Sequence, residues 1–446
     1  MLTLINIGLL IILAFSIVMA FKRPIYGYCC FIAIRILVPE VARSPLADAI
    51  SFNTTIIFVI IVSLIYKEGK SFMRVVRNDY FSKTLIVFFL YAIITLPLSN
   101  YGDIGIQYKN TIQFFLTDIL PIIIFISVIH TKKDFDILVK VFLVATIACC
   151  IYSVFTAFVS FNPLVTTFKL AFDKTGELTA SDLVEDFKTG RGLAASGTFV
   201  HTNGFGYFIS MSIPICVYLI AKKYHIKLSI ATLLLLVVNL FLCKKRSPLV
   251  SMGVFLIAYL FVSRNKEKFK YLLYTIGSIF LFMVLIELLP ALSSINNMLE
   301  SSFYFWDDKL LAKNDVGGSS WELRVRQLVY PFTEIKDNLI FGHGYGWCAW
   351  YRDELILHPI LYGFETIFST AVCELGIMGY FIYFKVFANS YKYSRPFRIK
   401  DTNYQLLNLI AEIVLIIATG LNYFYFWGFG IILLRKGDLL ESKNYV

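Results

Sequence analysis

Long apolar segments separated by short basic ones are the feature of this sequence that most limits what it can fold into. A helix needs about 20 apolar residues to cross about 30 Å of hydrocarbon. Runs near that length recur along the chain, at residues 2–20, 24–40, 50–66, 84–99, 108–130, 135–160, 203–221, 226–243, 247–263, 270–290 and 359–387. We therefore expect an all-α, polytopic transmembrane helix bundle of about 12 spans, forming a single integral membrane domain over residues 1–446.

The last apolar run, 404–434, is long for one span and short for two. Gly420 and Asn422 interrupt it near its middle, so it is either one broken helix or a tight hairpin. The basic pair Arg435 and Lys436 favours the hairpin, with a C-terminus on the cytoplasmic side.

The composition agrees with a membrane protein and excludes several other classes. Hydrophobic residues make up 58% of the chain and charged residues 16%, whereas soluble domains carry about 45–50% and about 25%. A soluble protein of this size could not bury so many apolar side chains. The same composition excludes a disordered chain and a collagen, and it predicts no nucleic-acid partner.

Two long polar segments interrupt the apolar runs. Residues 161–202 carry 4 basic and 5 acidic side chains, and residues 291–357 carry 6 basic and 9 acidic ones. The net charge of +11 therefore comes from the short loops and the C-terminal end. Because short cytoplasmic loops concentrate Lys and Arg, we expect both long segments to be extracytoplasmic loops.

The second long loop contains a predicted amphipathic helix. Ser319 and Glu322 fit a capping box, and apolar side chains recur at helical spacing from Trp321 to Phe332. Pro331 and then Asp337-Asn338 are expected to end this helix. A turn should follow in the glycine-rich stretch 342–346, which contains His343.

Two glycine-rich or basic segments could bind an anion at the outer face. The stretch around Arg191, followed by residues 196–204 with His201, leads directly into a span, where a helix N-terminus favours negative charge. The alternative is a flexible loop that ends in a helix cap. The turn containing Lys245 and Arg246 should also face outward, against the positive-inside trend, so it either binds phosphates or indicates a miscounted span.

Two further places combine arginines with proton acceptors. Arg324 and Arg326 lie two apart on the amphipathic helix, so only one can face a shared site; a solvated helix face is the alternative. His358 and Glu365 lie seven apart, so they share a face if the span at 359–387 is helical from its start. His358 could then act as a general base or be an interfacial side chain without a role, and His343 is its weaker rival.

The sequence contains no convincing cluster of metal ligands, so we expect no metal and no other cofactor. Guanidinium groups in place of a cation suit a reaction whose leaving group is a diphosphate, because planar forks can stabilise its developing charge.

These stretches resemble the O-antigen ligase and O-antigen/capsule polymerase superfamily of polytopic membrane glycosyltransferases. The resemblance covers roughly residues 190–380. It rests on the order and spacing of residues 197–204, Arg246-Ser247, Arg324 with the 342–346 turn, Glu365, and residues 374–379.

The resemblance implies an enzyme of the bacterial cytoplasmic membrane with an outward-facing site. Its donor and acceptor would be undecaprenyl-diphosphate-linked oligosaccharides, with a chain-length regulator as a further partner. Arg191, Arg246 and Arg324 would hold the diphosphate, and His358 or Glu365 would take or orient the proton. This chain has His358-Pro359 where ligases of the family carry a polar residue after the His, which favours a polymerase.

Two other functions remain as alternatives. An O-antigen ligase would differ only in its acceptor, which would be lipid A-core. A lipid-linked oligosaccharide flippase or another transporter would place charged residues deep inside several spans and would contain discontinuous helices. The mostly apolar span centres and the absence of a visible repeat disfavour the transporter.

The predicted topology can be tested by cysteine labelling. We expect Ser181→Cys and Ser319→Cys, made separately in a Cys348→Ser background, to react with a membrane-impermeant reagent in intact cells, because both loops should face outward. Labelling that appears only after the cytoplasmic membrane is permeabilised would contradict this orientation.

Overall fold

The described part of the protein is almost entirely helical, as expected. A computed structural model describes residues 2–98, 101–159, 161–172, 188–189, 192–263, 277, 321–355, 358–393, 402–419 and 424–442. Two short antiparallel hairpins depart from the all-α expectation: β1 (Arg43–Ser44) pairs with β2 (Ala47–Ser51), and β3 (Lys188–Thr189) pairs with β4 (Gly192–Leu193).

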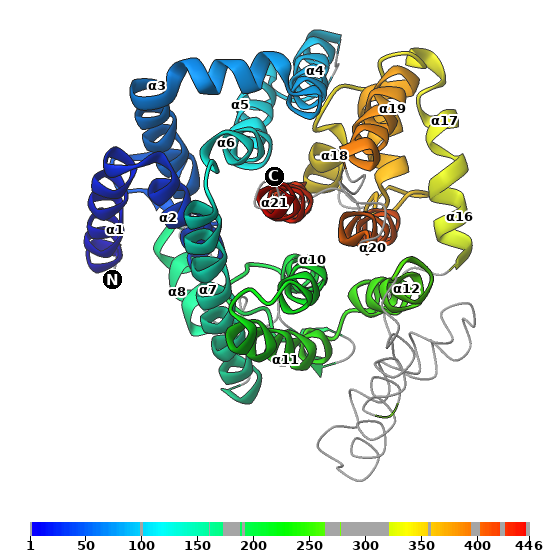
Figure 1. Ribbon diagram of the computed structural model, residues 1–446. Helices are drawn as coiled ribbons and strands as arrows, with labels where there is room; N and C mark the ends of the chain where they lie inside the picture. The colour runs from blue at the N-terminus through cyan, green and yellow to red at the C-terminus, as the bar shows by residue number, and fades with distance from the viewer. Residues whose placement is uncertain are drawn as a thin grey trace.

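The helices follow the order in Figure 1. They are α1 (Leu2–Lys22), α2 (Pro24–Leu37), α3 (Phe52–Asn78), α4 (Tyr80–Thr95), α5 (Ile104–Phe114), α6 (Leu120–Val128), α7 (Lys132–Val159), α8 (Pro163–Phe172), α10 (Thr202–Ala221), α11 (Ile226–Leu242), α12 (Arg246–Val262), α16 (Trp321–Val329), α17 (Pro331–Glu334), α18 (Trp347–Leu355), α19 (Ile367–Tyr393), α20 (Tyr404–Thr419) and α21 (Phe424–Ser442). Single turns of 3-10 helix follow α4 (Leu96–Leu98) and α17 (Lys336–Asn338), and a π-helical turn (Phe115–Ile119) joins α5 to α6.

Several described segments can cross a membrane. Six are long and apolar enough: Leu2–Lys22, Tyr80–Leu98, Ile104–Val128, Lys132–Ala157, Thr202–Ala221 and Ile367–Tyr393. Shorter apolar helices, among them α2, α11, α12 and α20, accompany them. These helices support a helical membrane protein, whereas the total of about 12 spans stays a prediction. The expected span 270–290 lies outside the described residues, apart from Gly277.

The run 404–434 forms two helices, α20 and α21, and not one broken helix. Helix α21 lies at the centre of the bundle in Figure 1, where it contacts α20, α10 and α6. Its residues 424–434 are all buried, with Trp427 fully enclosed, and partial exposure begins only at Arg435. A helix that is apolar all round belongs in such an interior position.

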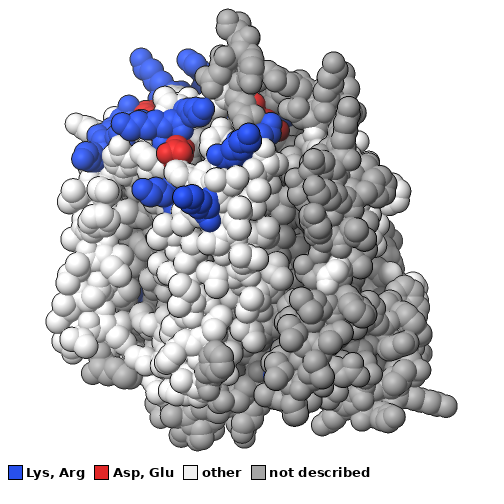
Figure 2. All heavy atoms as spheres, turned by 60° about the horizontal axis from the view of Figure 1, so that its bottom comes forward, with Lys and Arg blue, Asp and Glu red and all other residues white. Residues whose placement is uncertain are grey.

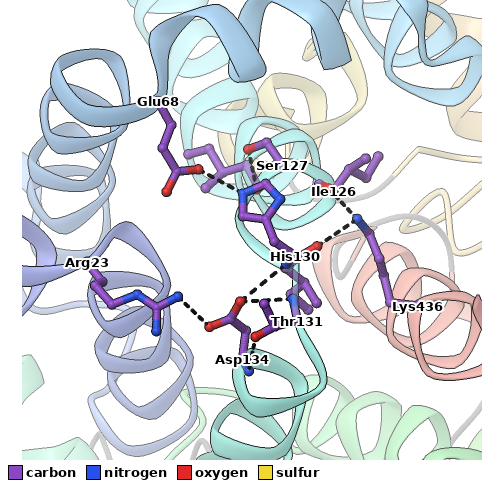
Figure 3. A network of polar contacts seen from close by, with 10 residues as sticks. Arg23, Glu68, Ile126, Ser127, His130, Thr131, Asp134 and Lys436 are labelled. Carbon is purple, nitrogen blue, oxygen red and sulfur yellow. Dashed lines mark hydrogen bonds and ion pairs between the residues drawn. The ribbon is translucent and has the colours of Figure 1, made fainter. Parts of the chain in front are cut away.

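One end of the bundle, which we call the basic end, collects the turns after α1, α6 and α10 and the last turns of α21. Figure 2 shows Lys and Arg side chains gathered along one edge of the molecule. At the basic end, Arg23 contacts Asp134 at 2.8 Å and His130 contacts Glu68 at 2.8 Å (Figure 3). Lys436 donates to the carbonyl of Ile126 at 2.6 Å. The Lys436 contact satisfies a carbonyl near the end of α6 that would otherwise lack a partner, and the other two contacts join side chains of neighbouring segments.

The opposite end, the loop end, carries the described parts of both long loops. Ala195 N–H donates to Leu242 O at 3.0 Å, at the end of α11. The Tyr101 hydroxyl, in the turn after α4, donates to Tyr345 O at 2.7 Å. The described parts of both segments therefore lie at this end; that the two segments are extracytoplasmic loops stays a prediction.

Two expected helix boundaries differ from the structure. The amphipathic helix is present as α16, but it ends at Val329, and the short helix α17 follows after Tyr330. The span expected at 359–387 begins only at Ile367. Residues 358–366 instead form a turn closed by a β-bridge between His358 and Tyr362, in which Tyr362 and Phe364 have positive φ. The proposed cap Ser319 lies outside the described residues.

Helix α19 is interrupted at Gly376, where φ is 65° and ψ is −168°. The freed backbone groups pair with the second loop. His343 N–H donates to Cys373 O at 2.8 Å, and Ile377 N–H donates to Leu339 O at 3.0 Å. Broken helices at membrane depth are tolerated where other protein groups satisfy the backbone in this way.

The loop and the helix cross at two glycines. A Cβ on Gly376 would lie 2.3 Å from Ile340 O, and one on Gly342 would lie 2.6 Å from Cys373 O. Both residues also have positive φ, which L-residues with a Cβ rarely adopt.

We expect Gly342→Ala and Gly376→Ala each to destabilise the protein by at least about 1–3 kcal/mol, because strain at positive φ adds to the steric clash. Gly253→Ala on α12 is the matched control, since nothing lies within 4 Å of its added Cβ, and it should be neutral or stabilising. Thermal unfolding in detergent measures the three variants. Equal melting temperatures would contradict the importance of the crossing.

Candidate functional site

His358 is held in a structural role at the loop end. Its side chain is 4% exposed. Its Nδ1 accepts the backbone N–H groups of Ile360 and Leu361, at 3.1 and 2.9 Å. That leaves Nε2 as the protonated nitrogen, which donates to Glu334 Oε2 at 3.3 Å. Because both nitrogens have partners, His358 orders its own turn and has no lone pair left for substrate.

The expectation that His358 and Glu365 share a helical face is wrong, because both precede α19. His358 is buried in an aromatic group that includes Tyr330, Tyr351 and Phe364, whereas Glu365 is exposed. The turn at 358–366 therefore places His358 in the interior and Glu365 at the surface, so they do not share a face.

His343, and not His358, has a ring nitrogen that could act as a general base. Its imidazole stacks on Trp347 with ring centroids 4.3 Å apart. Its Nε2 lies 4.0 Å from Glu334 Oε1 and has no hydrogen-bond partner among the described residues. Burial lowers the pKa of His343, opposed by the nearby carboxylates of Glu334 and Asp337. The ring is thus neutral near pH 7, and Nε2 can accept a proton.

The structure brings the basic turn between α11 and α12 against the chain that follows β4. The turn between α11 and α12 carries Lys245 as the N-cap residue and Arg246 as the first residue of α12, both half-buried. The backbone contact between Ala195 and Leu242 places the chain just after β4 against this turn. A close packing of Gly206 on Pro248 joins α10 to α12 a little further along.

The remaining candidates are only partly described. Arg191 lies outside the described residues, and Arg324 is described by its backbone alone, on α16. Arg326 is exposed on the same helix. His201 is exposed and is the N-cap residue of α10, without a side-chain capping bond. Helix α16 contacts the turn at 358–366, where Gln327 donates to Leu361 O at 2.9 Å.

Sequence reasoning missed a buried ion pair between α2 and the π-helical turn. Arg35 lies 3.3 Å from Asp118 and 3.0 Å from Glu40, with 6% of its side chain exposed. Asp118 also accepts from the Thr117 hydroxyl at 2.7 Å. The available signal was simple, since a charged residue inside an apolar run indicates a functional site. π-Helical turns are also frequent at such sites.

It also missed the surroundings of Glu374, which lies two residues before the break in α19. This carboxylate is buried and accepts Cys348 N–H at 3.2 Å. The nearby Tyr345 is half-buried, and desolvation together with the charges of Glu374 and Asp118 raises its pKa. In the described part of the chain, no three potential metal ligands lie together.

No protein-family model matches this chain, and no curated protein proves similar to it. Its function must therefore be inferred from its own residues and contacts.

The lowered pKa of His343 predicts a pH dependence of stability. Above about pH 6.5 the ring is neutral in both the folded and the unfolded states. As the pH falls further, the unfolded chain binds the proton first, so the free energy of unfolding decreases. We expect the fall in melting temperature from about pH 7.5 to about pH 5 to be smaller for His343→Gln than for the wild type. An unchanged slope in His343→Gln would refute the effect.

Proposed function

We propose that this protein is a membrane glycosyltransferase that polymerises undecaprenyl-diphosphate-linked oligosaccharide repeat units. The product would be an O-antigen, capsular polysaccharide or exopolysaccharide, made on the outer face of the bacterial cytoplasmic membrane. The observation that carries the proposal is the pairwise gathering of the four candidate segments at the loop end. Residues 192–201 contact the Arg246 turn, and α16 and α17 contact the turn at 358–366.

In the proposed reaction, an acceptor sugar hydroxyl attacks the anomeric carbon of the donor. The new glycosidic bond forms as the bond to the diphosphate breaks, and the hydroxyl proton passes to His343. An oxygen at hydrogen-bond distance, about 2.8 Å, from both His343 Nε2 and Glu334 Oε1 is compatible with their separation of 4.0 Å. His343 therefore replaces His358 and Glu365 as our choice of base.

The arginines would stabilise the diphosphate as it leaves. Arg246 at the start of α12, aided by Lys245, would bind the leaving diphosphate, since anions are favoured at a helix N-terminus. Arg191 and Arg324 are proposed to complete this group from the two long loops. Bidentate guanidinium contacts can neutralise the developing charge without a metal ion, and we propose that the reaction needs none. A ligase using lipid A-core as acceptor would employ the same groups.

A transporter of lipid-linked oligosaccharide is the second candidate function. Two structural observations, which the sequence did not predict, favour a transporter. Helix α19 is discontinuous at Gly376, and charged side chains lie inside spans, including Asp118 and Glu374. Transporters bind substrate at such breaks, but they do not require a neutral histidine near a carboxylate in an outer loop.

Purified protein supplied with lipid-diphosphate-linked repeat units should lengthen them in the presence of EDTA and release free lipid diphosphate. His343→Gln should slow lengthening about 100- to 10,000-fold, as expected on loss of a general base. The control His225→Gln should remain active, because His225 pairs with Asp136 at the basic end. If wild-type protein moves the lipid-linked sugar across vesicles without lengthening it, the transporter is correct. A strict need for a divalent ion would refute the arginine mechanism.

The role of Arg246 needs a separate test. Arg246→Lys keeps the charge but loses the planar fork, so a bidentate diphosphate contact should fail. We expect lengthening to slow about 100- to 1,000-fold. Arg326→Lys, on the exposed side of α16, is the matched control. Equal rates for both variants would remove Arg246 from the mechanism.

A further inference from the structure

A row of buried polar side chains follows one face of α20. Gln405, Asn408 and Glu412 are spaced three and four residues apart, so they lie on the same side of the helix. Each is at most 1% exposed, although the helix is otherwise apolar. Side chains of this kind inside a span are costly, and they commonly mark pathways for ions or protons.

The polar atoms of this row are incompletely paired. Within the described residues, the amide oxygen and nitrogen of Asn408 have no hydrogen-bond partner, nor has Glu412 Oε2. The hydroxyl of Tyr383, buried on α19, also has none. An apolar core offers nothing to replace such bonds, and each missing one costs several kcal/mol. A structural role alone gives no reason to retain four unpaired atoms together with a carboxylate.

The row reaches ionisable groups towards both ends of the bundle. At the basic end, Gln405 donates to Asp438 Oδ2 at 2.6 Å, and Asp438 Oδ1 accepts from the Tyr218 hydroxyl at 3.1 Å. Towards the loop end, the buried Tyr383 hydroxyl lies within electrostatic range of Tyr345, Glu412 and Glu374, without a direct hydrogen bond to any of them among the described residues. Glu374 in turn lies beside the break in α19, against the second loop.

We propose that these groups form a proton pathway across the bundle, from Asp438 through Asn408, Glu412 and Tyr383 to Glu374. Carboxyl and phenol groups can both donate and accept protons, so they can pass one along. The residues on α20 are separated by about 4.5 and about 6 Å along the helix axis. Single water molecules can bridge gaps of this size between polar groups.

The buried pair of Arg35 and Asp118 does not serve the same purpose. Its charges are matched, with Glu40 as a further partner. Glu412 differs because its nearest described hydrogen-bond partner is a hydroxyl, that of Tyr207, and not a cation. Because no cation pairs with Glu412 among the described residues, this carboxyl group can take up and release a proton without breaking an ion pair, whereas Asp438 at the basic end also pairs with Lys222 at 3.8 Å. The pathway does not depend on the proposed glycosyl transfer.

The test measures proton flux in lipid vesicles containing the purified full chain. A potassium gradient with valinomycin sets the membrane potential, and an enclosed pH-sensitive dye reports proton entry. Wild-type vesicles should acidify faster than protein-free ones. Glu412→Gln should reduce the protein-dependent rate about 100-fold, as for removal of a positioned proton-transfer group. Asn408→Leu should reduce it as well, because it removes the polar bridge between Gln405 and Glu412.

Two control variants separate the pathway from general damage to the fold. Asn239→Leu removes another fully buried asparagine, on α11, whose amide donates to backbone carbonyls away from α20. Glu68→Gln neutralises a carboxylate at the surface of the basic end. Both should keep wild-type flux at equal protein content. Wild-type flux no faster than in protein-free vesicles, or equal flux in Glu412→Gln, would overturn the proposal.

Discussion

The close crossing of two backbones at Gly342 and Gly376 is the constraint on which the loop end depends. It lets the second loop pair directly with the interrupted backbone of α19, so that the loop replaces the missing helical hydrogen bonds. The same pairing positions His343 beside Glu334, and it places Glu374 against the turn before α18. A single Cβ at either glycine would separate these groups, because the displaced atoms are backbone and cannot rotate away.

The basic end is held by a different kind of contact. Asp134 accepts from the N–H groups at the start of α7 and from Arg23, while Lys436 caps carbonyls at the end of α6 (Figure 3). Each charge therefore satisfies a helix terminus and joins two helices at once. Charged groups near the loop end are placed at helix ends too: Arg35 lies in the last turn of α2, and Glu374 accepts a backbone N–H at the start of α18.

Long apolar runs were enough to predict most of the long helices, because such a run in a membrane can satisfy its backbone only as a helix. The helices α8 and α18 lie in the two segments expected as loops and were not predicted. The prediction also failed where tertiary contacts override local preference. Residues 358–366 are apolar enough to begin α19 earlier. They form a turn instead, because the ring of His358 accepts the backbone N–H groups of Ile360 and Leu361. The break at Gly376 was equally hidden, since its partner lies in another loop. Arg35 and Glu412 were overlooked because single charges scarcely change the hydropathy of a whole run.

The two proposals concern different depths of the same bundle. We place the proposed sugar transfer at His343, whose side chain is 31% exposed in the second loop, and the proposed proton pathway at buried groups on α20 and α19. Glu374 lies where the two meet. Its backbone carbonyl accepts the N–H of Gly344, in the glycine-rich turn that carries His343. Because the Gly342–Gly376 crossing fixes both sides of that junction, a displacement of the second loop would alter the environment of His343 and of Glu374 together. Binding of substrate at the loop could in this way change the surroundings of the interior carboxylates, and the reverse coupling would have the same magnitude.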